Sequence, residues 1–198
     1  MEGEENKKEV NKESYSVVRF ILELVKITLI SLAIVIPVRY FLVQPFYVRG
    51  ASMEPNFYDR DYLIINEISY RFTEPSRGDV VVFKYPLNPR EYFIKRIIGL
   101  PGETIEIKEG KVKIYNKLYP QGIVLDESSY LFPGTKTGGN LKISLGPDEY
   151  YLLGDNRNAS LDSRSFGPVP RKNIIGKVLL RGWPFSRFSK FEEPLYNF

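Results

Sequence analysis

The stretch Thr104-Ile-Glu-Ile-Lys-Glu-Gly-Lys-Val-Lys-Ile-Tyr115 is the strongest indicator of the fold. Two short runs rich in β-branched residues flank Glu109-Gly110, which predicts a β-hairpin that turns at this dipeptide. Similar runs, bounded by Gly, Pro, Asn or Asp, occur at residues 62–66, 80–83, 92–98, 150–153 and 174–180. No long helical period follows residue 44, and the sequence has no internal repeat. The sequence therefore predicts a mainly β fold, in which antiparallel sheets form a closed or nearly closed, barrel-like domain.

The composition excludes several kinds of catalytic site. The 198 residues include no cysteine and no histidine, and 28 Lys and Arg against 24 Asp and Glu give a formal net charge of +4. The absence of cysteine and histidine excludes a Ser-His-Asp triad, a thiol nucleophile, a disulfide and an ordinary zinc site. A serine nucleophile would need another base, for which lysine is the main alternative. We expect no metal and no cofactor, and the scattered basic residues argue against a nucleic-acid groove.

The N-terminal region divides into a polar tail and an apolar segment. The tail is rich in Glu and Lys, and an uncharged run at 27–38 lies between Lys26 and Arg39. As a helix this run spans about 18 Å, and snorkelling of the two flanking cations extends the apolar segment to about 20 residues. The expected parts are a cytoplasmic polar tail at 1–16, a transmembrane anchor at 17–44 and an exported β domain at 45–198, with an irregular surface excursion at 117–140.

Two alternatives for the apolar segment stay open. A buried core helix would carry apolar residues on every face, and a removable signal peptide lacks a small-x-small cleavage site before Ala51. For an anchor, more Lys and Arg residues precede the segment than closely follow it. This bias favours a single-pass protein with a cytoplasmic N-terminus and its β domain on the outer face.

Three polar segments are candidates for chemistry. Ser52 lies in a Gly- and Pro-bounded turn that can expose a hydroxyl and aim a backbone N–H at an oxyanion. Lys95 lies in an apolar strand, and burial of its face would lower its pKa and make it a base. A dense polar run at 153–164 follows another apolar strand. Each segment also has an interpretation without catalysis. The Ser52 segment could be a plain turn, the Lys95 segment an edge strand protected by its charges, and the run at 153–164 a polar turn network.

Taken together and in this order, the three segments resemble type I signal peptidase, the membrane-bound leader peptidase of bacteria. The resemblance covers most of the chain and is far more specific than a single Ser or Lys. It implies a serine endopeptidase of the bacterial cytoplasmic membrane, with a Ser/Lys dyad, that removes signal peptides from exported preproteins. The matching motifs are QPFYVRGASMEP (44–55), RGDVVVF (77–83), FIKRIIGLPGE (93–103), GDNRNASLDSR (154–164) and GPVP (167–170).

The resemblance implies roles for individual residues. Ser52 would be the nucleophile, with its backbone N–H in the oxyanion hole, and Lys95 the general base. Ser160 would orient the lysine amine. In some members a serine hydroxyl two residues before the nucleophile is a second oxyanion donor, but this position is Gly50 here. The residues expected to support the site are Asp155, Asp162 and Arg164.

The resemblance also implies how the substrate binds. The family binds the extended segment before the scissile bond by β-addition, with shallow apolar pockets for small side chains at −1 and −3. The expected partners are signal-peptide-bearing preproteins, the lipid bilayer and, by proximity, the export translocon. The expected pocket walls are Phe46, Val48, Met53, Phe93 and Ile94.

Two other functions stay open on the sequence. A self-cleaving repressor shares a Ser/Lys site, but this chain has no helix-turn-helix segment and carries the apolar N-terminal segment. An inactive, membrane-tethered β module is the other alternative, against which the full set of catalytic side chains argues. The lack of histidine excludes the eukaryotic-type branch of the family, whose base is a histidine.

Overall fold

The computed structural model describes residues 2–37, 44–191, 194 and 196, and the chain divides into two compact units, Met1–Leu42 and Val43–Phe198. In the first unit α1 (Glu2–Pro37) is one continuous helix, which therefore includes most of the expected polar tail. The end of the expected anchor, at 38–43, lies outside the described residues. Among the described residues, no helix combines the length and the apolar character that a membrane crossing requires.

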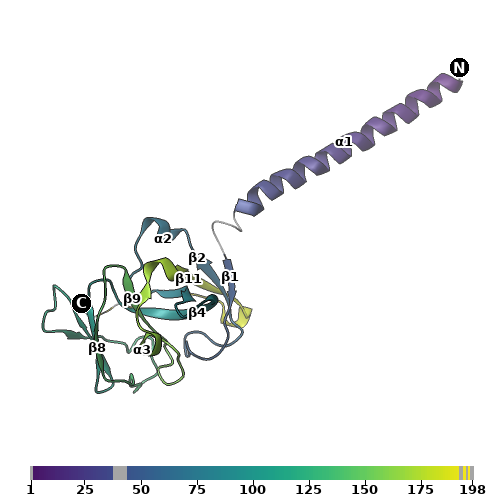
Figure 1. The fold of residues 1–198 in the computed structure, drawn as a ribbon. Helices are drawn as coiled ribbons and strands as arrows, with labels where there is room; N and C mark the ends of the chain where they lie inside the picture. Colours follow the sequence, from purple (N-terminus) through teal and green to yellow (C-terminus); the bar gives the residue numbers. More distant parts are fainter. Residues whose placement is uncertain (1, 38–43, 192–193, 195, 197–198) are drawn as a thin grey trace. The chain divides into compact units, whose positions relative to one another are not determined.

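The second unit is built from two antiparallel sheets (Figure 1). Its strands are β1 (Gln44–Tyr47), β2 (Tyr62–Asn66), β3 (Val80–Tyr85), β4 (Asn88–Gly99), β5 (Thr104–Lys108), β6 (Lys111–Tyr115), β7 (Ile123–Val124), β8 (Leu141–Ser144), β9 (Glu149–Leu153), β10 (Val169–Pro170), β11 (Ile174–Trp183) and β12 (Ser189–Lys190). Short helical turns are α2 (Ser69–Phe72), α3 (Ser163–Phe166), η2 (Arg171–Asn173) and η3 (Phe185–Arg187). The larger sheet has the order β1-β2-β11-β3-β4-β9-β10, with β12 paired to β11, and the smaller has the order β7-β6-β5-β8.

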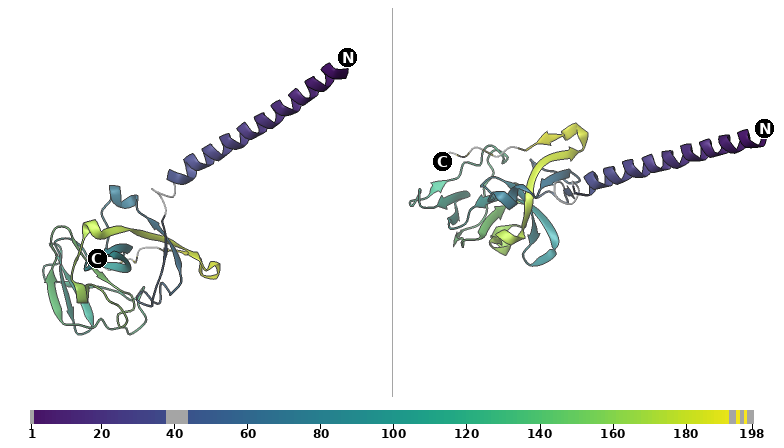
Figure 2. Two further views of the ribbon diagram at one scale, coloured as in Figure 1. Left: turned by 45° about the vertical axis from the view of Figure 1, so that its right-hand side comes forward. Right: turned by 90° about the horizontal axis from the view of Figure 1, so that it is seen from above.

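Neither sheet closes into a barrel, which corrects the expected architecture. The larger sheet ends at β1 on one side and at β10 on the other, and no described strand joins these two edges. The chain leaves this sheet after β4, builds the smaller sheet and returns as β9 (Figure 2). The antiparallel, mainly β prediction is confirmed, but the strands that would be needed for closure form a second open sheet.

The hairpin predicted from the sequence forms as β5 and β6. Lys108 pairs with Lys111, and the two residues between them, Glu109 and Gly110, have φ values of 53° and 79°. Positive φ at both central positions is what a type I′ turn requires, and its twist matches that of the flanking strands. The turn therefore sets the register between β5 and β6.

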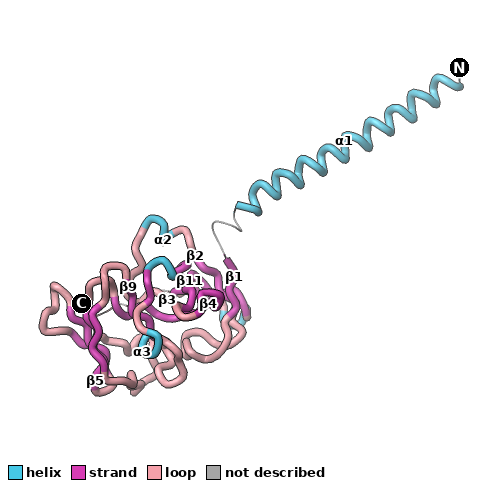
Figure 3. The backbone as a smooth tube through the Cα atoms, viewed as in Figure 1, coloured by secondary structure: helices cyan, strands magenta, loops and turns pink. Residues whose placement is uncertain are grey.

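The segment at 117–140 is mostly loop, as Figure 3 shows, with only the short strand β7 in it. It is nevertheless packed into the domain, because Leu125, Tyr130, Leu131 and Thr137 are buried. Leu125, Tyr130 and Leu131 join the apolar cluster of the smaller sheet. This segment therefore forms part of the core instead of only a surface excursion.

A separate apolar cluster supports the segment between β1 and β2. It includes Met53, Phe57, Leu63 and Val82, drawn from the turn and from two strands of the larger sheet. Full burial of each such side chain contributes about 1.5–3 kcal/mol. The turn that contains Ser52 is thus anchored by its own apolar residues.

Candidate active site

Ser52 lies in the turn between β1 and β2. The backbone N–H of Phe57 donates to the Met53 carbonyl at 2.9 Å, and both side chains are buried beneath the turn. Gly50 has φ +86°, a conformation that favours glycine, and its N–H donates to Asp59 Oδ1 at 2.8 Å. The Gly50 N–H is therefore already hydrogen-bonded to a carboxylate. The Ser52 N–H has no acceptor among the described residues.

Lys95 lies in an internal strand of the larger sheet. It pairs with Val81 of β3, and the next residue, Arg96, pairs with Leu153 of β9. The edge-strand interpretation of Lys95 is therefore wrong. The side chain is 3% exposed, its Nζ lies 2.8 Å from Ser52 Oγ, and it also donates to the Ile94 carbonyl at 2.8 Å.

The surroundings of Lys95 favour its neutral form. Burial lowers the pKa of Lys95 from 10.5 to about 8, although the charges of Asp162 and Asp155 act in the opposite direction. A neutral amine that donates one hydrogen to Ile94 keeps a lone pair for the proton of Ser52. A hydroxyl and an amine of the kinds that can serve as nucleophile and base thus lie within hydrogen-bond reach.

The loop between β9 and α3 lies against the Ser52 turn. A Cβ atom on Gly154 would come 2.1 Å from Ser160 Oγ and 2.5 Å from the Ser52 carbonyl oxygen, so only glycine fits between them. Ser160 Oγ is buried and meets the full hydrogen-bond geometry with no described residue, but its hydroxyl faces the Asp162 carboxylate and helps to lower the pKa of that group. Its expected role in orienting Lys95 stays a prediction.

Asp162 and Arg164 hold this loop together. Arg164 donates through Nε and Nη2 to the two carboxylate oxygens of Asp162, at 2.8 Å each, and Gly154 N–H donates to the same carboxylate. Burial raises the pKa of Asp162, but the hydrogen bonds and charge of Arg164 outweigh burial and hold the pKa below its ordinary value. Asp162 therefore stays ionised.

Asp155, one of the residues expected to support the site, organises a second buried cluster. It accepts hydrogen bonds from Arg96 Nε at 2.8 Å, Arg96 Nη2 at 2.7 Å and Asn56 Nδ2 at 2.7 Å. Asn156 donates from its backbone to the Ser52 carbonyl at 3.0 Å and from Nδ2 to the Ala51 carbonyl at 3.1 Å. Arg96, Asn56 and Asn156 were not among the predicted site residues. The only sequence clue was the second cation beside Lys95.

A groove of about 650 Å³ opens at Ser52 and Lys95. Its apolar and aromatic lining consists of Phe46, Tyr47, Val48, Leu63, Val82, Tyr92, Phe93, Ile94 and Leu161. Four of the five predicted pocket walls therefore line the groove. The fifth, Met53, does not, because its side chain is 1% exposed and packs in the core beneath the turn.

A serine hydroxyl next to a buried amine, at the base of an apolar groove, is the arrangement of a serine hydrolase. The sequence profile of the family described as "Signal peptidase, peptidase S26" matches residues 21–183. The chain therefore belongs to the signal peptidase family, peptidase S26. It is a serine endopeptidase, and at the level of the family its activity is the removal of signal peptides.

Two sequence relatives agree with this membership. Signal peptidase I of Leptolyngbya laminosa is 38% identical over 88% of this chain and 85% of the relative. Signal peptidase IB of Staphylococcus aureus (strain MRSA252) is 32% identical over 85% of this chain and 90% of the relative. A crystal structure of a signal peptidase I from Enterococcus faecalis is 28% identical, with a TM-score of 0.43, over 53% of this chain and 97% of that chain.

Proposed function

We propose that this chain cleaves signal peptides with Ser52 as the nucleophile and Lys95 as the general base. The observation that carries the proposal is the 2.8 Å separation between Lys95 Nζ and Ser52 Oγ, two groups 43 positions apart in the chain. A general base must also be able to lose its proton, and burial makes this possible because it lowers the pKa of the amine to about 8. A base with this pKa is partly neutral at mildly alkaline pH and can accept the serine proton.

Acylation follows from this geometry. Lys95 takes the proton of Ser52 Oγ while the oxygen attacks the scissile carbonyl, and the free backbone N–H of Ser52 binds the oxyanion. When the C–N bond breaks, the Lys95 ammonium returns the proton to the leaving amine, which becomes the N-terminus of the mature protein. Ser52 is then esterified by the signal peptide.

Deacylation uses the same two groups. A water molecule gives a proton to Lys95 and attacks the ester carbonyl. Ser52 Oγ leaves and recovers the proton from the ammonium, and the signal peptide departs with a new carboxyl terminus. Ser160 would hold the lysine amine in place during both steps, and Asp162 with Arg164 would hold the loop that carries Ser160.

The groove favours small side chains beside the scissile bond. Substrate would add as an extended strand along β1, with its −1 and −3 side chains directed at Phe46, Val48, Phe93 and Ile94. With these aromatic and aliphatic walls, alanine-sized groups would be the side chains accepted at −1 and −3. We place the enzyme in the bacterial cytoplasmic membrane, single-pass, with its N-terminus in the cytoplasm, near the lipid bilayer and the export translocon.

The proposal is tested by cleavage of an Ala-x-Ala signal peptide by the detergent-solubilised full chain. Ser52→Ala and Lys95→Ala should each lower kcat by about 10⁴-fold or more, because each removes a group that acts in the transition state. The wild-type rate should rise with pH through about 8, where Lys95 loses its proton.

Lys84→Ala is the matched control, since Lys84 lies in the neighbouring strand β3 and does not line the groove. This variant should cleave at the wild-type rate. Substantial turnover by Lys95→Ala would refute the dyad.

A further inference from the structure

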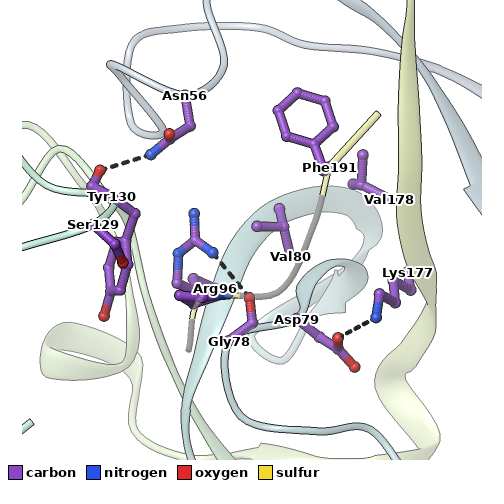
Figure 4. Close-up of a pocket in the computed structure, with 11 residues that line it drawn as sticks. Asn56, Gly78, Asp79, Val80, Arg96, Ser129, Tyr130, Lys177, Val178 and Phe191 are labelled. Carbon is purple, nitrogen blue, oxygen red and sulfur yellow. Dashed lines mark hydrogen bonds and ion pairs between the residues drawn. The ribbon is translucent and has the colours of Figure 1, made fainter. Parts of the chain in front are cut away.

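Asn56 lies four residues after the nucleophile and joins two other parts of the domain. Its side-chain Nδ2 donates to Asp155 Oδ2 and to the Tyr130 carbonyl, at 2.7 Å each. Both amide hydrogens are thereby used, one on each partner. Figure 4 shows the Asn56 side chain directed toward Tyr130, with Arg96 on the same cavity.

Asp155 extends this contact to the strand that carries the base. Its two carboxylate oxygens accept hydrogen bonds from Arg96 Nε and Nη2, and Arg96 follows Lys95 directly in β4. The ion pair is buried, with side-chain exposures of 6% for Arg96 and 0% for Asp155. A buried bidentate pair of this kind holds its partners in one geometry.

The backbone of Asn56 is held as well. Its N–H donates to the Met53 carbonyl at 3.0 Å, and its own carbonyl accepts from Arg181 Nη2 at 2.6 Å. Asn56 therefore links the Ser52 turn to β11 through its backbone, and to β4 and the 117–140 segment through its side chain. A rotation of this turn would move Ser52 relative to Lys95.

We propose that Asn56 is a positioning residue, whose side-chain amide holds the Ser52 turn against the Arg96–Asp155 pair and so sets the distance between Ser52 and Lys95. This inference rests on the proposed Ser/Lys mechanism and adds a residue that does not itself touch the reacting atoms. A misplacement of about 1 Å between reacting groups costs about 100-fold in rate, so a hydrogen bond at this distance can control turnover.

The test uses the full chain in detergent and the same Ala-x-Ala peptide. Asn56→Ala should lower kcat by about 10- to 100-fold with KM changed less than about threefold, because the groove walls are untouched. Asn56→Asp keeps the shape but replaces the donor with an acceptor beside Asp155. It should lose at least as much activity at pH 8 as Asn56→Ala, since like charges at this distance repel.

Asn116→Ala is the matched control. The Asn116 side chain also donates to a buried carboxylate, Glu103, at 2.9 Å, and that carboxylate is also paired with an arginine, Arg77. Asn116 does not contact the Ser52 turn. Asn116 Oδ1 also accepts from the backbone N–H groups of Leu118 and Tyr119, so Asn116→Ala should lower Tm at least as much as Asn56→Ala. It should nevertheless keep the wild-type kcat.

A second readout separates positioning from general loosening. If the turn shifts and water reaches Lys95, the pKa of the amine moves back toward 10.5, so the pH-rate profile of Asn56→Ala should rise at higher pH than that of the wild type. An unchanged profile, a kcat within twofold of the wild type, or equal kcat losses in Asn56→Ala and Asn116→Ala would overturn the inference. The proposed dyad is judged separately by Ser52→Ala and Lys95→Ala, so its failure and the failure of the Asn56 role can be told apart.

Discussion

The domain contains two buried clusters with the same chemistry and different surroundings. In one, Asp155 binds Arg96 and Asn56. In the other, Glu103 binds Arg77 and Asn116, and also accepts the backbone N–H of Leu100 at 2.9 Å. Both arginines and both carboxylates are almost fully buried. Each cluster contains an arginine, a carboxylate and an asparagine amide, although Arg96 binds its carboxylate through two nitrogens and Arg77 through one.

The difference is what each cluster holds. The Asp155 cluster joins the Ser52 turn to the residue beside Lys95, whereas the Glu103 cluster joins the segment before β3 to the loop that enters the smaller sheet. Chemically similar interactions should therefore contribute comparably to stability but unequally to catalysis. What the side chains touch, and not their type, decides which of the two roles they have.

The largest effect is expected when the arginine is removed from each cluster. Arg96→Met and Arg77→Met should each lower the free energy of unfolding by about 3–5 kcal/mol, because each leaves a buried carboxylate without its counter-charge. Denaturant unfolding measures this loss. The folded fraction of Arg96→Met should also lose kcat, whereas the folded fraction of Arg77→Met should keep it. Equal kcat values for the two folded variants would contradict the distinction.

A smaller effect on stability is expected at Lys95 itself. Between pH 8 and 10.5 the unfolded chain holds a proton on Lys95 and the folded protein does not, so wild-type stability should rise with pH through this window. Below pH 8 both states are protonated and the full cost of burying the charge is present. Lys95→Met should therefore raise the free energy of unfolding at pH 7 by up to about 3 kcal/mol.

Unfolding measured at pH 7 and at pH 10.5 checks this prediction. The gain from Lys95→Met should shrink at the higher pH, where wild-type Lys95 is neutral in the folded state. A gain that does not depend on pH would show that packing, and not charge burial, causes it.

The smallest effect is expected at the second contact to the Ser52 turn. Asn156→Ala removes the Nδ2 hydrogen bond to the Ala51 carbonyl and should cost about 1 kcal/mol of stability, together with a loss of kcat. Asn173→Ala removes a similar bond, to the Lys84 carbonyl at 3.0 Å, and neither Asn173 nor Lys84 lines the groove. Thermal unfolding should show similar shifts for both variants. If Asn173→Ala lost as much kcat as Asn156→Ala, the local role of Asn156 would be wrong.

Much of the fold could be read from local sequence. The hairpin at Glu109-Gly110 and the strands around it formed where β-branched residues and turn residues predicted them, because these preferences act over a few neighbouring residues. Barrel closure could not be read in this way. It depends on which distant strands pair. β4 pairs with β9, and all strands of the smaller sheet lie between these two in the chain.

In the candidate site, too, local sequence predicts some features and tertiary packing decides the others. Motifs singled out Ser52, Lys95, Ser160 and Asp162 as residue types able to do the chemistry. Met53 and Asn56 show the limit, because a turn sequence does not tell which side chains enter the core and which contact a distant loop. Only packing placed Met53 beneath the turn and the Asn56 amide on Asp155.

By itself the sequence determined which reactions were available: with no histidine and no cysteine, a serine could be activated only by a group such as lysine. Tertiary structure decided whether this lysine could act, because the pKa of an amine depends on the surfaces that exclude water from it. Strands distant in the chain provide those surfaces around Lys95, and they bring its nitrogen within 2.8 Å of Ser52.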